Sequence, residues 1–287
     1  MAGSSPASIR QVVAEVDGIR SPVRESGPAG RDEAVVFVHG NPGSGDDWTR
    51  LLAEVGVFAR ALAPDMPGFG RADKPDDFAY TVPGYAAHLQ HLLEHRGVAR
   101  AHLVLHDFGG PWGLAWAARH PDRLASVTLI NIGVMPGYRW HYLATIWRTP
   151  VLGELFMATV TRPGFRLSLK HGNPRGLPPA FVDRMFDDFD RGTRRAVLRL
   201  YRATPDPGGV AAQMLTAALR PLDRPALVIW GARDPYVPVR YADRQRDVFP
   251  RARVVTLPES GHWPFADDPD AVARELVPFL REQVGKA

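Results

Sequence analysis

The chain has no cysteine among its 287 residues, which excludes a disulfide framework and every metal site built on thiolates. It also lacks an apolar run of membrane-spanning length, and residues 1–8 are small and polar, without the apolar core of a signal peptide. We therefore expect a cytoplasmic protein with no membrane partner. The motif Gly-x-Ser-x-Gly is absent as well, which argues against a lipase, an esterase or a serine peptidase.

Charge of neither sign dominates the chain. Lysine and arginine together number 35 and aspartate and glutamate 31, which gives a net charge of +4. The positive residues are nearly all arginine, and they are scattered among acids instead of forming a patch. Because nucleic-acid-binding proteins concentrate basic charge on one face, we expect no nucleic-acid partner.

Short runs rich in valine, leucine and isoleucine alternate with helix-like segments. The runs predict strands buried in a parallel sheet, at residues 35–39, 61–64, 101–106, 126–131, 225–231 and 253–257, after an irregular strand pair at 9–24. The helix-like segments lie near residues 46–55, 83–96, 110–120, 238–248 and 269–283. This alternation predicts an α/β fold with a mostly parallel sheet.

The alternation breaks between residues 134 and 221. This stretch is aromatic and rich in arginine, is punctuated by proline and glycine, and contains no clear strand. We predict that residues 134–221 form a helical cap inserted into a main domain made of residues 1–133 and 222–287. A chain of this length can bury the large core that such a main domain needs.

The sequence around Asp107 predicts a tight turn between a strand and a helix. The apolar run 101–105 precedes it, and a helix-like run at 111–119 follows Gly109 and Gly110. A turn of this kind lifts one side chain above the sheet. A carboxylate at the raised position can attack a carbon atom and displace a leaving group, which leaves a covalent alkyl ester on the enzyme.

Motifs after the other predicted strands complete a pattern. Residues 39–43 (His-Gly-Asn-Pro-Gly) and 65–70 (Asp-Met-Pro-Gly-Phe-Gly) follow early strands, Asp234 follows the strand after the predicted cap, and His262 follows the last strand. The motifs and the chain order nucleophile, acid, histidine resemble the α/β-hydrolase superfamily over nearly the whole chain. With aspartate at the turn, the chain is similar to the epoxide hydrolases and haloalkane dehalogenases. The resemblance implies the α/β-hydrolase fold with an inserted helical cap.

The resemblance also implies a catalytic triad. Asp107 would be the nucleophile, His262 the base that activates water against the ester, and Asp234 the acid that fixes the imidazole tautomer and stabilises the imidazolium. Some relatives carry the acid at the position of Asn131, at the end of an earlier strand. Asparagine there favours Asp234 as the acid.

Two backbone amides, of Asn41 and Phe108, would form the oxyanion hole for hydrolysis of the ester. The resemblance implies no organic cofactor and no metal. His88, His91 and His95 share one face of a predicted helix, but no carboxylate joins them at ligand spacing, so we interpret them as a partly solvated face.

The leaving group separates the two kinds of enzyme. Dehalogenases typically bind halide with the tryptophan after the nucleophile, together with an asparagine of the His-Gly-Asn-Pro loop or a cap tryptophan. In this chain Phe108 replaces the first donor, whereas Asn41 and Trp147 would be available.

Epoxide hydrolases typically protonate the opened ring with two cap tyrosines. Tyr201 resembles the second of these, and its partner stays open between Tyr138 and Tyr142. We favour hydrolysis of an epoxide to a diol, with haloalkane dehalogenation as the alternative and a non-catalytic binding protein on the same fold as a minor one. The expected partners are a small apolar organic substrate and water, and a homodimer stays an open alternative.

Overall fold

The computed structural model describes residues 6–286. Residues 1–5, part of the N-terminal stretch considered above, and residue 287 lie outside this range. The strands are β1 (Ile9–Val16), β2 (Ile19–Ser26), β3 (Glu33–Val38), β4 (Ala61–Pro64), β5 (Arg100–His106), β6 (Leu124–Ile130), β7 (Ala226–Gly231) and β8 (Arg253–Leu257). The helices are α1 (Thr49–Val55), α2 (Val82–His95), α3 (Gly109–Arg119), α4 (Tyr142–Arg148), α5 (Leu152–Thr159), α6 (Arg162–Gly172), α7 (Pro179–Asp188), α8 (Arg191–Ala203), α9 (Val210–Leu219), α10 (Arg240–Asp243), α11 (Pro264–Asp267) and α12 (Pro269–Gln283), with 3-10 turns η1 (Gly45–Trp48), η2 (Pro121–Arg123), η3 (Arg220–Leu222) and η4 (Arg244–Asp247). No helix within residues 6–286 has the length and apolarity needed to cross a membrane.

The strands form one eight-stranded sheet in the order β1-β2-β4-β3-β5-β6-β7-β8. The pairs from β4 to β8 are parallel, and β2 pairs antiparallel with both β1 and β4. The predicted α/β class and mostly parallel sheet are therefore confirmed. The strand pair predicted at 9–24 is confirmed, but the prediction that it is irregular is wrong, and the pair extends to Ser26. The two strands pair regularly from Ile9–Ser26 to Val16–Ile19, because Asp17 and Gly18 both adopt positive φ and close a two-residue turn.

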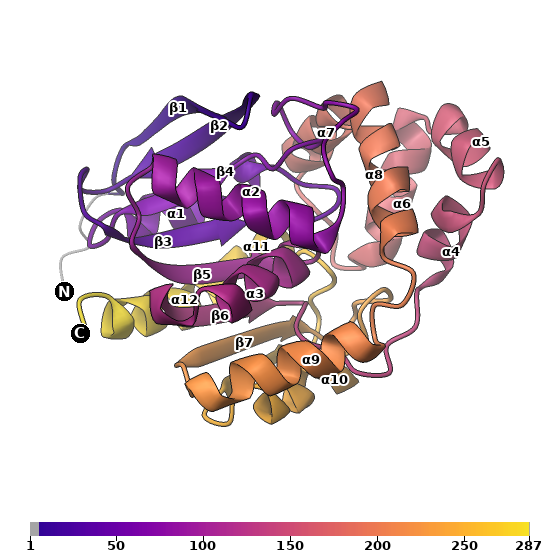
Figure 1. Ribbon diagram of the computed structural model, residues 1–287. Helices are drawn as coiled ribbons and strands as arrows, with labels where there is room; N and C mark the ends of the chain where they lie inside the picture. Colours follow the sequence, from indigo (N-terminus) through magenta and orange to yellow (C-terminus); the bar gives the residue numbers. More distant parts are fainter. Residues whose placement is uncertain (1–5, 287) are drawn as a thin grey trace.

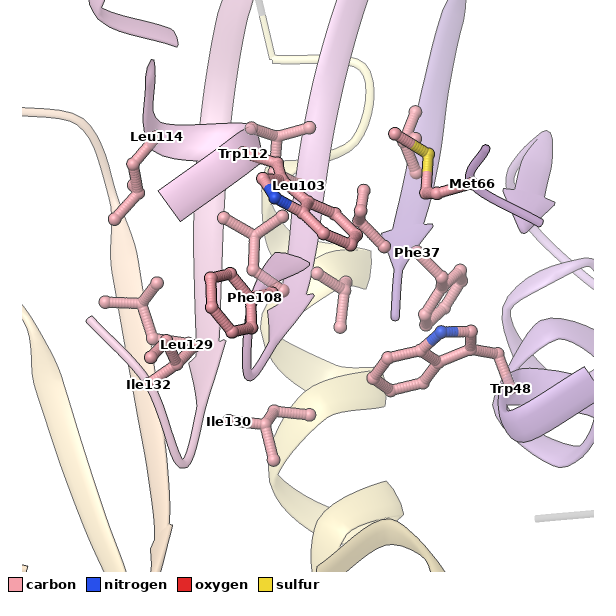
Figure 2. Packing of buried hydrophobic residues seen from close by; sticks show 14 of the residues in the cluster. Phe37, Trp48, Met66, Leu103, Phe108, Trp112, Leu114, Leu129, Ile130 and Ile132 are labelled. Carbon is pink, nitrogen blue, oxygen red and sulfur yellow. The ribbon is translucent and has the colours of Figure 1, made fainter. Parts of the chain in front are cut away.

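Helices cover both faces of the sheet. The pair α2 and α3 lies in front of the sheet in Figure 1 and α12, which packs against α1, lies behind it. The central strands β3 to β7 are almost entirely buried, as their runs of apolar residues predict. Figure 2 shows the core between sheet and helices, where Trp112 of α3 and Trp48 of η1 lie among Phe37, Leu103 and Leu129 of the strands.

The segment 134–221 is helical and carries no strand in the structure. Its helices α4 to α8 stand beside the sheet in Figure 1. Arg184 of α7 ties them to the main domain, because its guanidinium donates to Asp47 at 2.7 Å and to Ser44 at 2.9 Å. The last helix of the segment, α9, packs against α3 and runs along β7 in Figure 1. By its packing, α9 groups with the helices that cover the sheet.

Candidate active site

The loop after β5 holds Asp107 above the sheet. Asp107 has a φ of 48°, a value that few residues other than glycine adopt. The chain approaches this turn closely on both sides. A Cβ atom at Gly109 would collide with the carbonyl of Val38, and one at Gly40 would collide with the Asp107 side chain. Glycine at positions 40 and 109 therefore has a steric cause.

The structure brings together the three side chains predicted to act as a triad. Asp107, Asp234 and His262 follow β5, β7 and β8, and the carboxyl ends of these parallel strands lie at one edge of the sheet. His262 Nδ1 donates to Asp234 Oδ2 at 2.7 Å, and His262 Nε2 lies 3.5 Å from Asp107 Oδ2. The imidazole therefore bridges two carboxylates.

Asp234 is fully buried and all its acceptor positions are engaged. Its Oδ1 accepts the backbone N–H groups of Tyr236 at 2.7 Å and Val237 at 3.0 Å. Its Oδ2 accepts the side-chain amide of Asn131 at 2.7 Å as well as His262. The sequence showed only that Asn131 is not an acid. In the structure its amide orients the acid that follows β7.

The charges of His262 and Asp107 shift the pKa values of these two groups in opposite directions, and each favours the charged form of the other. Burial alone would favour a neutral imidazole, but Asp234 and Asp107 outweigh it and hold the pKa of His262 above its ordinary value. Burial would likewise favour a neutral Asp107, yet the hydrogen bond and charge of His262 hold the pKa of Asp107 below its ordinary value. Both shifts favour a protonated His262 beside an ionised Asp107 in the resting site.

Asn41 contacts the same carboxylate from the loop after β3. Its backbone N–H donates to Asp107 Oδ1 at 2.6 Å. His39 fixes this loop, because its Nε2 accepts the backbone N–H of Met66 at 3.0 Å. The other residue predicted for the oxyanion hole, Phe108, follows Asp107 directly. Its ring lies in the core cluster with Trp112 and offers no polar group (Figure 2).

A cavity of about 560 Å³ opens in front of Asp107, between the sheet edge and the helices of segment 134–221. Its size suits a small organic molecule. Tyr201 of α8 lies in its wall, fully buried, and its hydroxyl oxygen accepts a long hydrogen bond of 3.4 Å from the Asn41 side-chain amide. Burial and the nearby charge of Asp107 raise the pKa of Tyr201 well above its ordinary value, so the phenol keeps its proton.

The other predicted cap residues divide into three cases. Trp147 lines the cavity, and its indole N–H is buried without a hydrogen-bond partner among the described residues. Tyr142 also lines the cavity but is 52% exposed, at the rim. Tyr138 does not line it, and its hydroxyl donates to the carbonyl of Tyr236 at 2.9 Å. Because of that bond, Tyr138 is not a free proton donor to the cavity. It therefore does not fit the role of partner to Tyr201 that the sequence left open between Tyr138 and Tyr142.

His141 lines the cavity as well, although no sequence motif singles it out. It is the N-terminal cap of α4, where its Nδ1 accepts the backbone N–H of Ala144 at 3.3 Å. Burial lowers the pKa of His141 to about 4, so the ring is neutral at pH 7 and its proton lies on Nε2. Histidine is an unusual helix cap, so no sequence pattern signals this fixed tautomer.

The row His88, His91 and His95 is not part of this site. All three lie on α2, where His88 is buried and His91 contacts Asp17 at 2.6 Å. Within residues 6–286 no three histidine, aspartate or glutamate side chains are grouped as a metal ion would require.

Comparison with known proteins assigns the family. The profile described as the alpha/beta hydrolase fold matches residues 33–269. The chain belongs to the α/β hydrolase fold family. This agrees with the resemblance seen in the motifs and with the order of the eight strands.

Proteins similar to this chain carry the names of different enzymes. A cis-3-alkyl-4-alkyloxetan-2-one decarboxylase of Xanthomonas campestris is 28% identical over 92% of this chain and 93% of its own length. A haloalkane dehalogenase of Bradyrhizobium diazoefficiens is 29% identical over 93% of this chain and 94% of its own. Among solved structures, the haloalkane dehalogenase DbeA of Bradyrhizobium elkani superimposes with a TM-score of 0.82 at 26% identity, covering 96% of this chain and 98% of DbeA. The epoxide hydrolase CorEH shares the fold, with a TM-score of 0.80 at 18% identity, covering 96% of this chain and 99% of CorEH.

Proposed function

We propose that this α/β hydrolase opens a small apolar epoxide through a covalent ester on Asp107 and releases the diol. The observation that carries the proposal is the buried phenol of Tyr201 in the wall of the same cavity as Asp107. Asn41 donates to the phenol oxygen, which leaves the hydroxyl hydrogen of Tyr201 free for an acceptor in the cavity. An opening epoxide provides such an acceptor, because its ring oxygen gains negative charge.

In the first step a carboxylate oxygen of Asp107 attacks a ring carbon. The carbon–oxygen bond of the epoxide breaks, an ester bond to Asp107 forms, and the released alkoxide takes the hydroxyl proton of Tyr201. His141 donates a second hydrogen bond to that oxygen from Nε2, in the place where a second tyrosine was expected. General acid assistance of this kind commonly contributes about 10²–10⁴-fold in rate.

The second step hydrolyses the ester. Esterification removes the charge of Asp107, which makes the His262 imidazolium a stronger acid. The tyrosinate of Tyr201, in the wall of the same cavity, takes the proton that His262 releases. Neutral His262 then takes a proton from water as the water oxygen attacks the Asp107 carbonyl carbon. The N–H groups of Asn41 and Phe108 stabilise the oxyanion. Collapse expels the diol oxygen, which takes the proton of the new carboxylic acid, so that Asp107 is again a carboxylate and His262 an imidazolium.

The oxetan-2-one in the name of the Xanthomonas relative is, like an epoxide, a strained ring in which carbon bonds to a leaving oxygen. This similarity supports an oxygen leaving group here. A halide would need several N–H donors. Phe108 supplies none from its side chain, and the side-chain amide of Asn41 is directed at Tyr201.

Haloalkane dehalogenation is the second candidate, and one observation favours it. The indole N–H of Trp147 is buried, lines the cavity and has no partner among the described residues. The second N–H of the Asn41 side-chain amide, which the bond to Tyr201 does not use, would give another donor for a halide. Relatives named haloalkane dehalogenase add weight to this candidate.

The test follows single turnovers of epoxides in heavy-oxygen water. We expect label in Asp107 and not in the first diol released. Tyr201→Phe should slow ester formation by about 10²–10⁴-fold and leave ester hydrolysis unchanged. Tyr142→Phe is the matched control, because the rim tyrosine is half exposed and should have little effect. Label in the first diol, or equal effects of the two substitutions, would refute the proposal. Absence of turnover with every epoxide and bromoalkane would favour the binding protein.

A further inference from the structure

A second cavity, of about 130 Å³, shares Asp107 and His141 with the first one. The rest of its wall differs and comes mostly from α3, α9, the loop after β6 and the loop between α8 and α9. Ala212 and Leu215 of α9 are among the lining residues. Asp206, the charged residue of its wall besides Asp107, is exposed to solvent. No step of the proposed reaction uses this cavity.

Aromatic rings separate the two cavities. Tyr201 lines only the first cavity, and Phe108 and Trp140 line only the second. The ring centre of Tyr201 lies 5.0 Å from that of Phe108 and 4.9 Å from that of Trp140, so the rings form one packed wall. Asp107 lines both cavities at this wall. A substrate carbon that bonds to Asp107 can therefore direct one substituent into each cavity.

The second cavity presents an apolar interior. The hydroxyl of Tyr138 donates to the carbonyl of Tyr236 at 2.9 Å, and the indole N–H of Trp140 donates to the carbonyl of Thr204 at 2.8 Å. The hydroxyl of Thr204 donates to the carbonyl of Leu200 at 3.0 Å. Because these donors are already engaged, the inner wall suits an alkyl group better than a polar one.

We propose that the second cavity is the subsite for the shorter alkyl arm of an epoxide substituted on both ring carbons. The longer arm fills the first cavity, and this assignment rests on the proposed epoxide opening. The second cavity, of about 130 Å³, is smaller than the first, of about 560 Å³, so it suits the shorter of the two arms.

The experiment changes the volume of each cavity separately. Leu215 is partly exposed in the wall of the second cavity, so Leu215→Trp adds bulk there with little strain on the core, and Leu215→Ala enlarges it. Leu167, which is 70% exposed and lines the first cavity, gives the matched control Leu167→Trp. Two substrates are compared, a terminal epoxide with one hexyl arm and a cis epoxide with a hexyl and a propyl arm.

We expect Leu215→Trp to lower kcat/KM for the two-armed epoxide at least about tenfold, whereas kcat/KM for the terminal epoxide should change little. Leu215→Ala should extend the accepted short arm beyond propyl. Leu167→Trp should change kcat/KM for both substrates by the same factor, because both place a hexyl arm in the first cavity. Equal losses for the two substrates in Leu215→Trp would overturn the subsite.

A binding measurement separates this inference from the proposed reaction. Heptanamide has one arm, and N-propylheptanamide has two arms around an unreactive centre. In calorimetric titrations Leu215→Trp should weaken the binding of N-propylheptanamide at least about tenfold more than the binding of heptanamide. If that holds while no epoxide is opened, the subsite stands and the proposed reaction fails. If the two amides respond alike, the subsite fails even where epoxides are turned over.

Discussion

Replacing Asp107 with asparagine should make His262 a much weaker base. His262 Nε2 and Asp107 Oδ2 are 3.5 Å apart in a buried site. At an effective dielectric constant of about 20, two unit charges at this distance attract by roughly 5 kcal/mol. Since about 1.36 kcal/mol corresponds to a tenfold change, loss of the charge should lower the His262 protonation constant by about 10³-fold. Asparagine keeps the size of the side chain, so the change isolates the charge.

The assay is a histidine-detected NMR titration of the wild type and of Asp107→Asn, with His262→Gln to assign the signal. In the wild type His262 should stay protonated well above neutral pH, because Asp234 and Asp107 hold its pKa above the ordinary value. In Asp107→Asn it should lose its proton at a much lower pH. Esterification of Asp107 removes the same charge in the proposed cycle, so the variant reproduces the state in which His262 must act as a base.

Stability gives an independent readout of the same coupling. A pKa that is higher in the folded than in the unfolded protein stabilises the fold below the ordinary histidine pKa, and this stability is lost as pH rises through the folded value. Alkaline pH should therefore destabilise the wild type more than Asp107→Asn. If the His262 signal titrates at the same pH in both proteins, the charge of Asp107 does not determine the base strength of His262, and the prediction is refuted.

Two further predictions concern the later step and the leaving group. His262→Gln should still form the ester and then stall, so that intact-protein mass spectrometry shows one added substrate mass. Asp234→Asn should slow the same step because it loses the 2.7 Å bond that orients the ring. An unmodified His262→Gln chain, after incubation with a substrate that the wild type consumes, would contradict this order of steps. Trp147→Phe removes the unpartnered indole N–H and should leave epoxide opening nearly unchanged. Brisk bromide release by the wild type from bromoalkanes, lost in Trp147→Phe and kept in Tyr201→Phe, would favour dehalogenation instead.

The fold and the centre of the site could be predicted from the sequence because each signal is local. A buried strand followed by a tight turn and a small-residue helix predicts a raised side chain at Asp107 without any long-range information. Parallel strands then bring their carboxyl ends to one edge, so the order of motifs predicts that Asp234 and His262 lie near it. The bounds of short helices were less predictable. The segment near 238–248 is split into α10 and η4, which hydrophobic periodicity alone does not resolve.

The surroundings of the centre could not be predicted, because they depend on contacts between distant segments. Tyr138 and Tyr201 both read as cap tyrosines, and only the bond from Tyr138 to the Tyr236 carbonyl distinguishes them. The role of His141 depends on a tautomer fixed by one backbone N–H. The second cavity needs α9 to pack against α3, a contact between residues about a hundred positions apart in the chain.

Asn131 shows how one uncharged residue determines the electrostatics of the centre. Its amide donates to the same Asp234 oxygen that accepts His262 Nδ1, at 2.7 Å in both cases. An acid at this position would place a second carboxylate against Asp234, and one of the two would then have to hold a proton. The amide instead donates a hydrogen bond to Asp234, on the side of the carboxylate that holds the imidazole. The only carboxylate beside His262 that changes its charge during the proposed cycle is therefore Asp107, so formation and hydrolysis of the ester switch the base strength of His262.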